Sequence, residues 1–288
     1  MKSKTIKKVL RQKIDQWLAS IDDNAVQVAA GGNTIVTGGA IASMLLGESV
    51  NDFDLYFRNK ETAVLVGEFY VAKFCASGHN LKMSVEEDRI RIVTQSGHRG
   101  ETQGDVRTLR DSGEIEDEYD ATEQAALNTV DEKPQYRPVF LSTNAITLSN
   151  KVQIILRFYG EPDEIHENYD FTHCTNYWTS WDNALVLRQV ALEALLAREL
   201  RYVGSKYPVC SVMRLRKFIK RGWNINAGQI LKMAMQISAL DLTDPKVLED
   251  QLTGVDSAYF LQIIEKLNEK DPEKVNAAYL VEIIDRMF

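Results

Sequence analysis

The chain has 288 residues, of which 44% are hydrophobic and 26% are charged, proportions that are ordinary for a globular protein with a substantial core. Its formal net charge of −7 argues against a protein that coats nucleic acid non-specifically, although a local basic groove is compatible with it. No apolar run approaches a membrane span, the basic N-terminus lacks the apolar core of a signal peptide, and the widely spaced cysteines show neither a disulfide framework nor a zinc pattern. We therefore expect a cytoplasmic protein with no membrane partner.

Short predicted elements lead up to the first acidic motif. Apolar residues at helical spacing predict an amphipathic helix over residues 4–20. The β-branched run at residues 34–37 predicts a strand, and residues 40–46 are good helix formers followed by Gly47 at the position of a C-cap. The chain then returns as a second strand, which carries an Asp-Phe-Asp sequence.

A diglycine turn links the first strand to the helix that follows it. Gly38 and Gly39 allow a tight turn because neither residue has a Cβ. The turn lies at a helix N-terminus, where free backbone N–H groups and the helix dipole favour an anion such as phosphate. The sequence therefore predicts a phosphate-binding turn.

Asp52 and Asp54 flank an apolar residue, which places both carboxylates on one face of their strand. Like charges at this spacing repel one another unless a cation lies between them. Mg²⁺ prefers carboxylate, water and phosphate oxygens, and paired metals clamp the attacking and leaving oxygens of a phosphoryl displacement. An isolated Asp-x-Asp is more often an ordinary pair of strand-edge acids, but next to the diglycine turn the pair predicts a metal site beside bound phosphate.

The region after this motif alternates between helical, strand and polar character. A polar insertion over residues 94–135 is predicted to be a solvated loop, with a mobile lid as the alternative. Around it, the pattern predicts a helix over 61–77, a strand or hairpin over 81–93, strands over 138–148 and 152–159, a helical turn at Pro162 and a strand over 169–174.

The chain changes character near residue 180, beyond which the pattern is almost wholly helical. We predict an α+β fold in which a mixed-sheet domain over residues 1–180, with helices on one side of the sheet, precedes an all-helical domain over residues 181–288. The helices expected in the second domain span 183–202, 211–221, 227–240, 245–252, 257–268 and 272–287.

The two motifs resemble those of the polymerase-beta-like nucleotidyltransferase superfamily, in which Gly-Gly or Gly-Ser and a short spacer precede Asp-h-Asp on the next strand. Residues 38–47, Gly-Gly-Ala-Ile-Ala-Ser-Met-Leu-Leu-Gly, are similar to the head domain of CCA-adding enzymes and bacterial poly(A) polymerases. Those enzymes carry Arg-Asp where this chain has Ala42-Ser43, so the metal and phosphate roles are expected to transfer and the CCA-specific role is not. The resemblance extends to phage and viral members over most of the chain from Gly38 to about Leu240.

The resemblance implies a third acid on a neighbouring strand, which would bind the second metal and help to deprotonate the acceptor hydroxyl. Asp170, inside the segment predicted as a strand, is the candidate. If this block instead matches the Arg-Arg-Asp-Phe-Thr motif of CCA-adding enzymes, with Asn168 and Tyr169 in place of the arginines, Asp170 would contact nucleotide. A hydrogen bond from loop backbone is the third possibility. Glu86 and Glu87 are the reserve candidates.

The second domain contains a cationic stretch in an otherwise acidic chain, with five cations in the eight residues of 214–221. In related two-domain enzymes a helical domain supplies Ser, Lys and Arg to the triphosphate or the acceptor, and fork-shaped and point charges suit that task. A solvated basic face is the alternative for any single residue. The nucleotide-binding residues that follow from the resemblance are Ser205, Lys206, Arg214 and Lys217, with Gly38, Gly39 and Ser43 in the first domain.

Together these features predict a metal-dependent nucleotidyltransferase of the two-metal type, with Asp52, Asp54 and Asp170 as catalytic and metal-binding residues and Mg²⁺ or Mn²⁺ as the cofactor. It would transfer a nucleoside monophosphate from a nucleoside triphosphate to a hydroxyl, with tRNA or another RNA 3′ end as the expected acceptor, and release pyrophosphate. The setting would be the host cytoplasm if a phage encodes the chain. Two alternatives stay open: modification of a protein, as in toxin-like members, and nucleotide binding by a regulator without catalysis.

Overall fold

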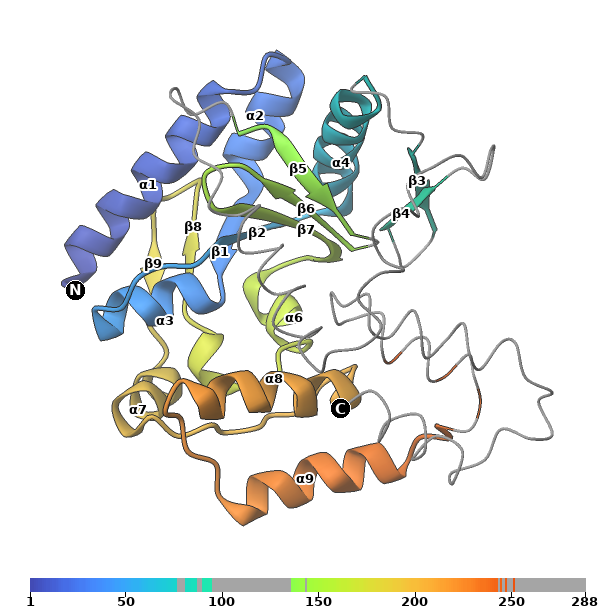
Figure 1. Cartoon of the computed structure of the whole chain (residues 1–288). Helices are drawn as coiled ribbons and strands as arrows, with labels where there is room; N and C mark the ends of the chain where they lie inside the picture. Colours follow the sequence, from blue (N-terminus) through green and yellow to red (C-terminus); the bar gives the residue numbers. More distant parts are fainter. Residues whose placement is uncertain are drawn as a thin grey trace, which may run out of the picture.

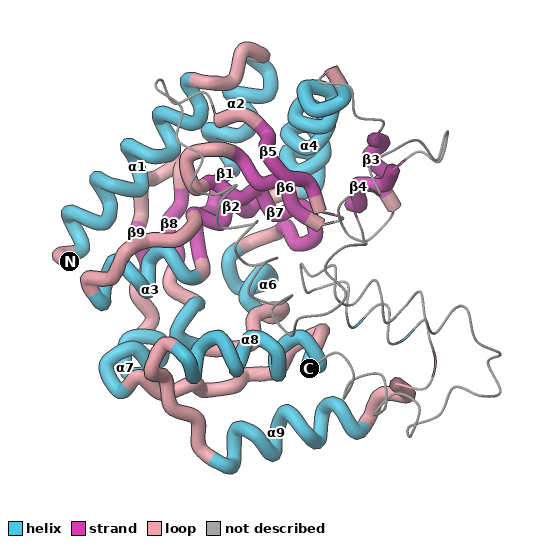
Figure 2. The backbone as a smooth tube through the Cα atoms, viewed as in Figure 1, coloured by secondary structure: helices cyan, strands magenta, loops and turns pink. Residues whose placement is uncertain are grey.

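The computed structural model of the chain describes residues 1–76, 81–86, 90–94, 136–142 and 144–242, together with residues 244, 247 and 251. Its centre is a mixed sheet with helices packed on one face and a second group of helices beyond the other face (Figure 1). The same layers are visible when the backbone is coloured by secondary structure (Figure 2). The predicted α+β class with a mixed sheet is confirmed.

The central strands of the sheet carry the predicted motifs. β1 (Thr34–Thr37) is antiparallel to β2 (Phe53–Phe57), and β2 is parallel to β7 (Val152–Tyr159). The remaining pairs in this sheet are antiparallel. The full order is β5-β6-β7-β2-β1-β8-β9, completed by β5 (Pro138–Leu141), β6 (Ala145–Leu148), β8 (Tyr177–Thr179) and β9 (Leu185–Val186).

One face of the sheet is covered by α1 (Ser3–Ala19), α2 (Asn24–Asn33) and α4 (Lys60–Cys75) (Figure 1). The predicted amphipathic helix is confirmed as α1, whose apolar stripe faces the core. Trp17 donates from Nε1 to the Tyr70 hydroxyl over 2.8 Å, which ties α1 to α4 inside that core. The buried stripe consists of Ile6, Leu10, Ile14 and Trp17.

α2 has no counterpart among the predicted elements. Its sequence ends in Ala-Ala-Gly-Gly-Asn, and each glycine lowers helix propensity by about 1 kcal/mol relative to alanine. Asp23 compensates at the other end, where it accepts from the backbone N–H groups of Ala25 and Val26. Val26 and Ala30 are buried, so tertiary packing and the N-cap outweigh weak local propensity.

A second group of elements lies beyond the opposite face of the sheet. α8 and α9 run one below the other on this side in Figure 1. A buried cluster joins them to the sheet domain through Ala42 and Phe171 on one side and Leu200, Tyr202 and Trp223 on the other. The elements are α6 (Pro162–His166), the 3-10 helix η1 (Thr172–Cys174), α7 (Gln189–Ala197), α8 (Pro208–Lys220) and α9 (Ala227–Ser238). α3 (Gly39–Leu46) contacts both groups, since Ala40, Ile41 and Met44 pack in the core with α1 and Ala42 belongs to the cluster of the second group.

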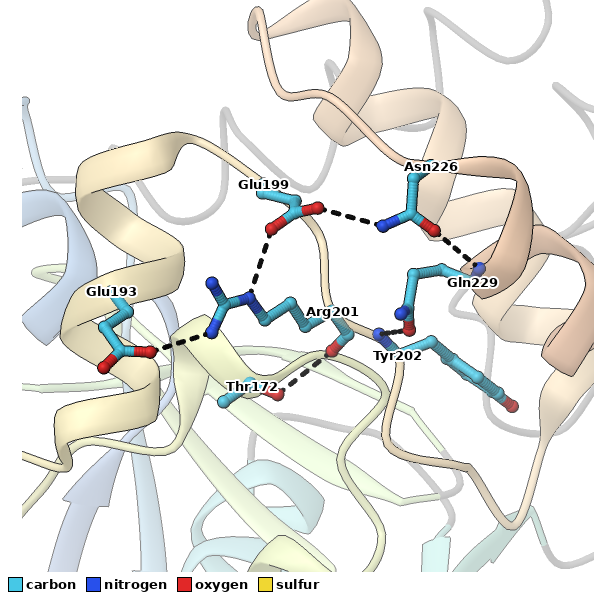
Figure 3. A network of polar contacts seen from close by, with 7 residues as sticks. All are labelled: Thr172, Glu193, Glu199, Arg201, Tyr202, Asn226 and Gln229. Carbon is cyan, nitrogen blue, oxygen red and sulfur yellow. Dashed lines mark hydrogen bonds and ion pairs between the residues drawn. The ribbon is translucent and has the colours of Figure 1, made fainter.

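A polar network holds the segment around Arg201 between η1, α7 and α9 (Figure 3). Arg201 forms ion pairs with Glu193 at 3.1 Å and with Glu199 at 3.2 Å. Thr172 in η1 donates from Oγ1 to the Arg201 carbonyl over 3.1 Å. The network continues to α9 through Asn226, which donates to Glu199, and Gln229, which accepts from the Tyr202 backbone N–H.

The predicted hairpin over residues 81–93 is confirmed as β3 (Leu81–Val85) and β4 (Ile90–Thr94), a separate antiparallel pair that lies next to α4 (Figure 1). Apart from Thr94, the predicted insertion lies outside the described residues, and so do the three helices predicted after residue 244 except for residues 247 and 251. Within the described part of the chain, no helix is long and apolar enough to cross a membrane.

The strand prediction for residues 169–174 is wrong. Only an isolated bridge joins Phe171 to Tyr202, and residues 172–174 form η1. The alternation of apolar and polar residues there reflects contacts with the helical part, because Thr172 and Asp170 bond to elements that follow residue 200. β8 and β9 take the place beside β1 instead, so the sheet runs past the predicted boundary near residue 180 and the predicted helix over 183–202 is reduced to α7.

Candidate functional site

Gly38 forms the turn that joins β1 to α3, and the Asp54 carboxylate lies against it. Gly38 has φ 91° and ψ −149°, a conformation that favours glycine, and its N–H donates to the Cys174 carbonyl over 3.1 Å. Thr37 pairs with Asp54 in the antiparallel ladder, which fixes the register of the two motifs. A Cβ on Gly38 would lie only 2.7 Å from Asp54 Oδ2. The turn and the second acid of the Asp-x-Asp motif therefore form one unit.

Gly38→Ala is expected to lower the free energy of unfolding by about 2–3 kcal/mol, because the new methyl group meets Asp54 and alanine is strained at this φ. Gly39→Ala is the matched control. Gly39 is the first residue of α3 and a Cβ there would have no neighbour within 4 Å, so this variant should be as stable as the wild type or slightly more stable. Urea unfolding of both variants checks the contrast; equal midpoints would contradict it.

Asp52 directly precedes β2 and is half-buried. Burial raises the pKa of its carboxyl, and the charges of Arg221, Lys151 and Lys217 act in the opposite direction without cancelling the effect. Two of these cations belong to α8 and the residue just after it. Burial raises the pKa of this carboxyl more than the neighbouring cations lower it. An additional positive charge would therefore stabilise the ionised carboxylate.

Hydroxyl and thiol groups surround the Asp54 carboxylate. The Tyr169 hydroxyl lies 3.6 Å from the position of a Cβ on Gly38. Burial and then the charge of Asp54 raise the pKa of Tyr56. Burial raises the pKa of Cys174 to about 12, with the charges of Asp54 and then Asp170 adding to the effect. The thiol is therefore protonated at neutral pH and lies in the field of both acids.

Asp170 faces α8 and is only 6% exposed. Ser211 donates from Oγ to one carboxylate oxygen over 2.8 Å, and the Arg214 guanidinium forms an ion pair with the other oxygen. The Asp170 carbonyl accepts from the backbone N–H of Val203 over 3.0 Å. This carboxylate is therefore engaged by the helical part of the chain.

The structure does not bring the three predicted acids together as one ligand set. No cluster of three or more His, Cys, Asp or Glu side chains suited to a metal ion is present among the residues described here. On β7, the strand parallel to β2, the register partner of Asp54 is Gln153, whose amide donates to Thr147 over 3.5 Å. Glu86, a reserve candidate, pairs with Arg91 at 3.9 Å on the hairpin; Glu87 lies outside the described residues.

α8 presents cations to both acidic positions. Arg214 pairs with Asp170, and Lys217 and Arg221 act on Asp52. The predicted site did not include Ser211 or Arg221. Helical periodicity could have indicated both, because Ser211 lies three residues before Arg214 and Arg221 lies seven residues after it, which places them on the same helix face. Cations of this helix and of the residue after it therefore act on both Asp170 and Asp52.

The other predicted nucleotide-binding residues have mixed surroundings. Ser205 is buried, and its Oγ accepts from the Tyr207 backbone N–H over 3.0 Å, so it shapes the loop before α8. Lys206 is exposed, and its carbonyl accepts from Gln251 over 3.1 Å. Ser43 is half-buried in α3. The nucleotide-binding role of each stays a prediction.

Residues 8–198 match the family described as "Gabija anti-defense 2 family protein", about two thirds of the chain. The chain belongs to this family. A relative named "Gabija anti-defense 2" from Bacillus phage SPbetaL7 is 19% identical over 258 residues, which cover 88% of this chain and 49% of the relative. The chain thus spans about half the length of that relative.

Solved structures of CCA-adding enzymes also resemble the chain. A "CCA-adding enzyme apo form I" matches with a TM-score of 0.42 and 13% identity over 91% of this chain and 53% of that one. The Bacillus stearothermophilus CCA-adding enzyme in complex with CTP matches with a TM-score of 0.41 and 14% identity over 92% and 53%. The Thermotoga maritima CCA-adding enzyme complexed with tRNA matches with a TM-score of 0.39 and 11% identity over 88% and 54%. Similarity at this level assigns no activity.

Two histidines of this Gabija anti-defense 2 family member are buried near the site, and neither was assigned a role from sequence. His166 lies in α6, and its Nε2 is 2.8 Å from the Thr37 hydroxyl. His173 stacks between Trp223 and Phe218, with ring centroids 4.2 and 4.8 Å away. Burial lowers the pKa of each histidine to about 4. Both rings are therefore neutral at pH 7.

These buried histidines predict acid sensitivity. An unfolded histidine binds a proton near pH 6.5, whereas the folded ones do so near pH 4, so the unfolded state takes up more protons in this window and stability falls as the pH drops. Each histidine should lower the free energy of unfolding by about 3 kcal/mol between pH 7 and pH 4. Urea unfolding at several pH values should give a shallower dependence for His173→Phe; an unchanged slope would refute the assignment.

Proposed function

We propose that the chain is a divalent-cation-dependent nucleotidyltransferase. The observation that carries the proposal is the packing of the Gly38 turn against the Asp54 carboxylate, with Asp52 two residues away and cations of α8 acting on it. A backbone turn at a helix N-terminus suits phosphate, and adjacent acids suit a divalent cation that would bridge them to phosphate.

The donor set fits Mg²⁺ or Mn²⁺. Asp52 and Asp54 supply carboxylate oxygens, and the pKa of Asp52 stays raised in spite of its neighbouring cations. Mg²⁺ is commonly held by one or two protein carboxylates, with water and substrate phosphates completing the shell. When bound, such a cation would neutralise charge on the phosphates and lower the pKa of a coordinated hydroxyl. Asp170 would join the set only after exchanging its present partners, Ser211 and Arg214.

Different groups of the protein would bind the triphosphate and accept the proton of the acceptor hydroxyl. In the turn that Gly38 forms, backbone N–H groups from Gly39 onward would bind the triphosphate, because the Gly38 N–H itself donates to the Cys174 carbonyl. Ser43, Lys206, Arg214 and Lys217 are the side chains proposed to contact it, with Ser205 holding the loop before α8. The acceptor oxygen attacks the α-phosphorus and the bond to pyrophosphate breaks. The hydroxyl proton passes to a carboxylate, for which Asp170 is the proposed base.

The acceptor that the chemistry favours is an RNA 3′ end, such as that of tRNA, because cations of α8 border the acids while the chain as a whole is acidic. The family is named for anti-defense against Gabija, and we propose that this modification acts against that defence in the host cytoplasm. Transfer to a protein hydroxyl is the alternative outcome within the same chemistry.

A second candidate function is nucleotide binding without transfer. Two observations favour it: Gln153 occupies the register position of a third acid on β7, and Asp170 is already paired. Such a protein would regulate or scaffold through its bound nucleotide.

A labelling screen separates these functions. The protein is incubated with each of the four labelled nucleoside triphosphates and Mg²⁺, with total RNA in one arm and whole-cell protein in the other. Transfer predicts a labelled acceptor and pyrophosphate release by the wild type and neither by Asp52→Asn. Label in the protein arm alone supports the protein-modifying alternative. Saturable, metal-dependent nucleotide binding without label in either arm supports the regulator and contradicts the proposed transfer.

A further inference from the structure

Arg157 on β7 is a buried cation that has no acidic partner among the residues that the structure describes. The residue is only 6% exposed. Nε and Nη2 both donate to the Tyr207 hydroxyl, over 3.0 and 2.6 Å. Within the described part of the chain, no carboxylate forms an ion pair with it. Its Nη1 makes no hydrogen bond to these residues and is not fully buried. One edge of the guanidinium therefore keeps a path to solvent.

A buried guanidinium in this state is costly. Taking a charge out of water requires a compensating charge or a full set of hydrogen bonds, and a neutral phenol oxygen supplies only part of this. Other arginines that are far more exposed have acidic partners: Arg58 pairs with Glu161, and Arg198 pairs with Glu48. Arg157 thus has the strongest need for an anion and the weakest partner of these three.

Arg157 also adjoins the proposed site through a chain of polar contacts. Tyr207, its only hydrogen-bond partner among the described residues, is the N-cap residue of α8. The Tyr207 carbonyl accepts from Ser211 Oγ over 3.3 Å, and the same hydroxyl donates to Asp170 over 2.8 Å. Since Asp170 already neutralises Arg214, this chain of contacts contains two guanidinium groups and one carboxylate. The local surplus is one positive charge.

Aromatic rings lie near the guanidinium of Arg157, so a ligand would approach through the edge that carries Nη1. The guanidinium carbon lies 5.6 Å from the centroid of the Phe158 ring and 5.9 Å from that of Tyr207, so aromatic groups flank it. An anion with oxygens arranged for a forked contact suits the remaining nitrogen and its neighbour. Phosphate has this geometry.

We propose that Arg157 forms a phosphate-binding position at the start of α8, separate from the Gly38 turn. The phosphate group belongs either to the nucleotide or to the backbone of a polynucleotide acceptor. The position needs no chemistry at Asp52 and Asp54, because it binds charge alone. It deepens the proposed function by adding a contact for substrate, yet it stands if that function is refuted.

Thermal unfolding of Arg157→Met tests the position without any nucleotide. In the absence of anions this variant should stay folded and unfold close to the wild-type temperature, because the removal of an uncompensated buried charge offsets the hydrogen bonds that Tyr207 loses. With inorganic tripolyphosphate and no divalent cation, the wild type should gain stability, and Arg157→Met should bind the probe at least tenfold more weakly by calorimetry. Arg157→Lys, which keeps the charge, should retain an intermediate affinity.

Arg216→Met is the matched control, since it removes one exposed cation from α8. It should bind tripolyphosphate as the wild type does. Failure of Arg157→Met to fold without anions, together with unchanged tripolyphosphate affinity in Arg157→Lys, would assign the residue a structural role and overturn the proposal. Equal tripolyphosphate affinity of Arg157→Met and the wild type would overturn it as well.

Two further titrations identify the source of the phosphate. If the nucleotide supplies it, Arg157→Met weakens binding of ATP with Mg²⁺ and leaves binding of single-stranded RNA unchanged. If a polynucleotide supplies it, the RNA affinity falls and the ATP affinity stays. No change in either titration overturns the proposal. A wild type that binds no ATP refutes the proposed transferase, while the tripolyphosphate result still decides the role of Arg157.

Discussion

Asp54→Asn is expected to lower the rate of nucleotidyl transfer by about 10³-fold or more, because it removes a negative charge that holds the divalent cation against phosphate. Asparagine has nearly the same shape, so the packing against Gly38 is retained and the unfolding temperature should not fall. The measurement is label incorporation or pyrophosphate release per folded protein at saturating nucleoside triphosphate. A loss of activity with intact folding places the effect in the chemistry.

Glu68→Gln serves as the control for a lost carboxylate. Glu68 is exposed on α4, one of the helices that cover the other face of the sheet (Figure 1). This variant should transfer at the wild-type rate. If Asp54→Asn keeps the wild-type rate, or if both variants lose activity equally, Asp54 is not the metal-binding acid of this protein.

Arg214→Met is expected to lower the free energy of unfolding by about 3 kcal/mol, because Asp170 is left buried with its charge uncompensated. The Arg214 side chain is 40% exposed, so water screens the pair and the loss should stay at the lower end of the range for buried pairs. Urea unfolding of the variant gives the value. Lys232→Met, which removes an exposed cation from α9, should change stability by less than about 0.5 kcal/mol.

A double-mutant cycle isolates the pair. Asp170→Asn together with Arg214→Met should be more stable than the sum of the single losses predicts, by about 1–3 kcal/mol, since the second substitution removes the charge that the first leaves unpaired. Additive losses would show that the two side chains do not depend on each other. In that event Asp170 would be available for the metal, as its sequence context predicted.

Local sequence features predicted the centre of the fold. The β-branched run before Gly38, the helix former after it and the alternation around Asp54 are signals within a few residues of each other, and the structure joins them in one turn and one antiparallel pair. Gly47 ends α3 with φ 77°, as a helix C-cap requires. Such features depend on neighbours in the chain, which the sequence displays directly.

Contacts between distant residues were the part that sequence did not predict. Asp170 was placed in a strand because its neighbours alternate, whereas Ser211 and Arg214, more than forty residues later, determine where its carboxylate points. Arg157 follows apolar residues of β7 and belongs to no motif. Only its lack of an acidic partner among the described residues draws attention to it. No motif pointed to His166, because its hydrogen bond with Thr37 spans 129 positions.

The most direct measurement is calorimetric titration of the wild type and Asp54→Asn with ATP, CTP, GTP and UTP, each with and without Mg²⁺. The proposed site predicts saturable binding of at least one nucleotide to the wild type, at least tenfold weaker without Mg²⁺ and equally weakened by Asp54→Asn. Absence of binding by all four nucleotides, or affinity that neither Mg²⁺ removal nor Asp54→Asn changes, would contradict a metal–nucleotide site at the Gly38 turn.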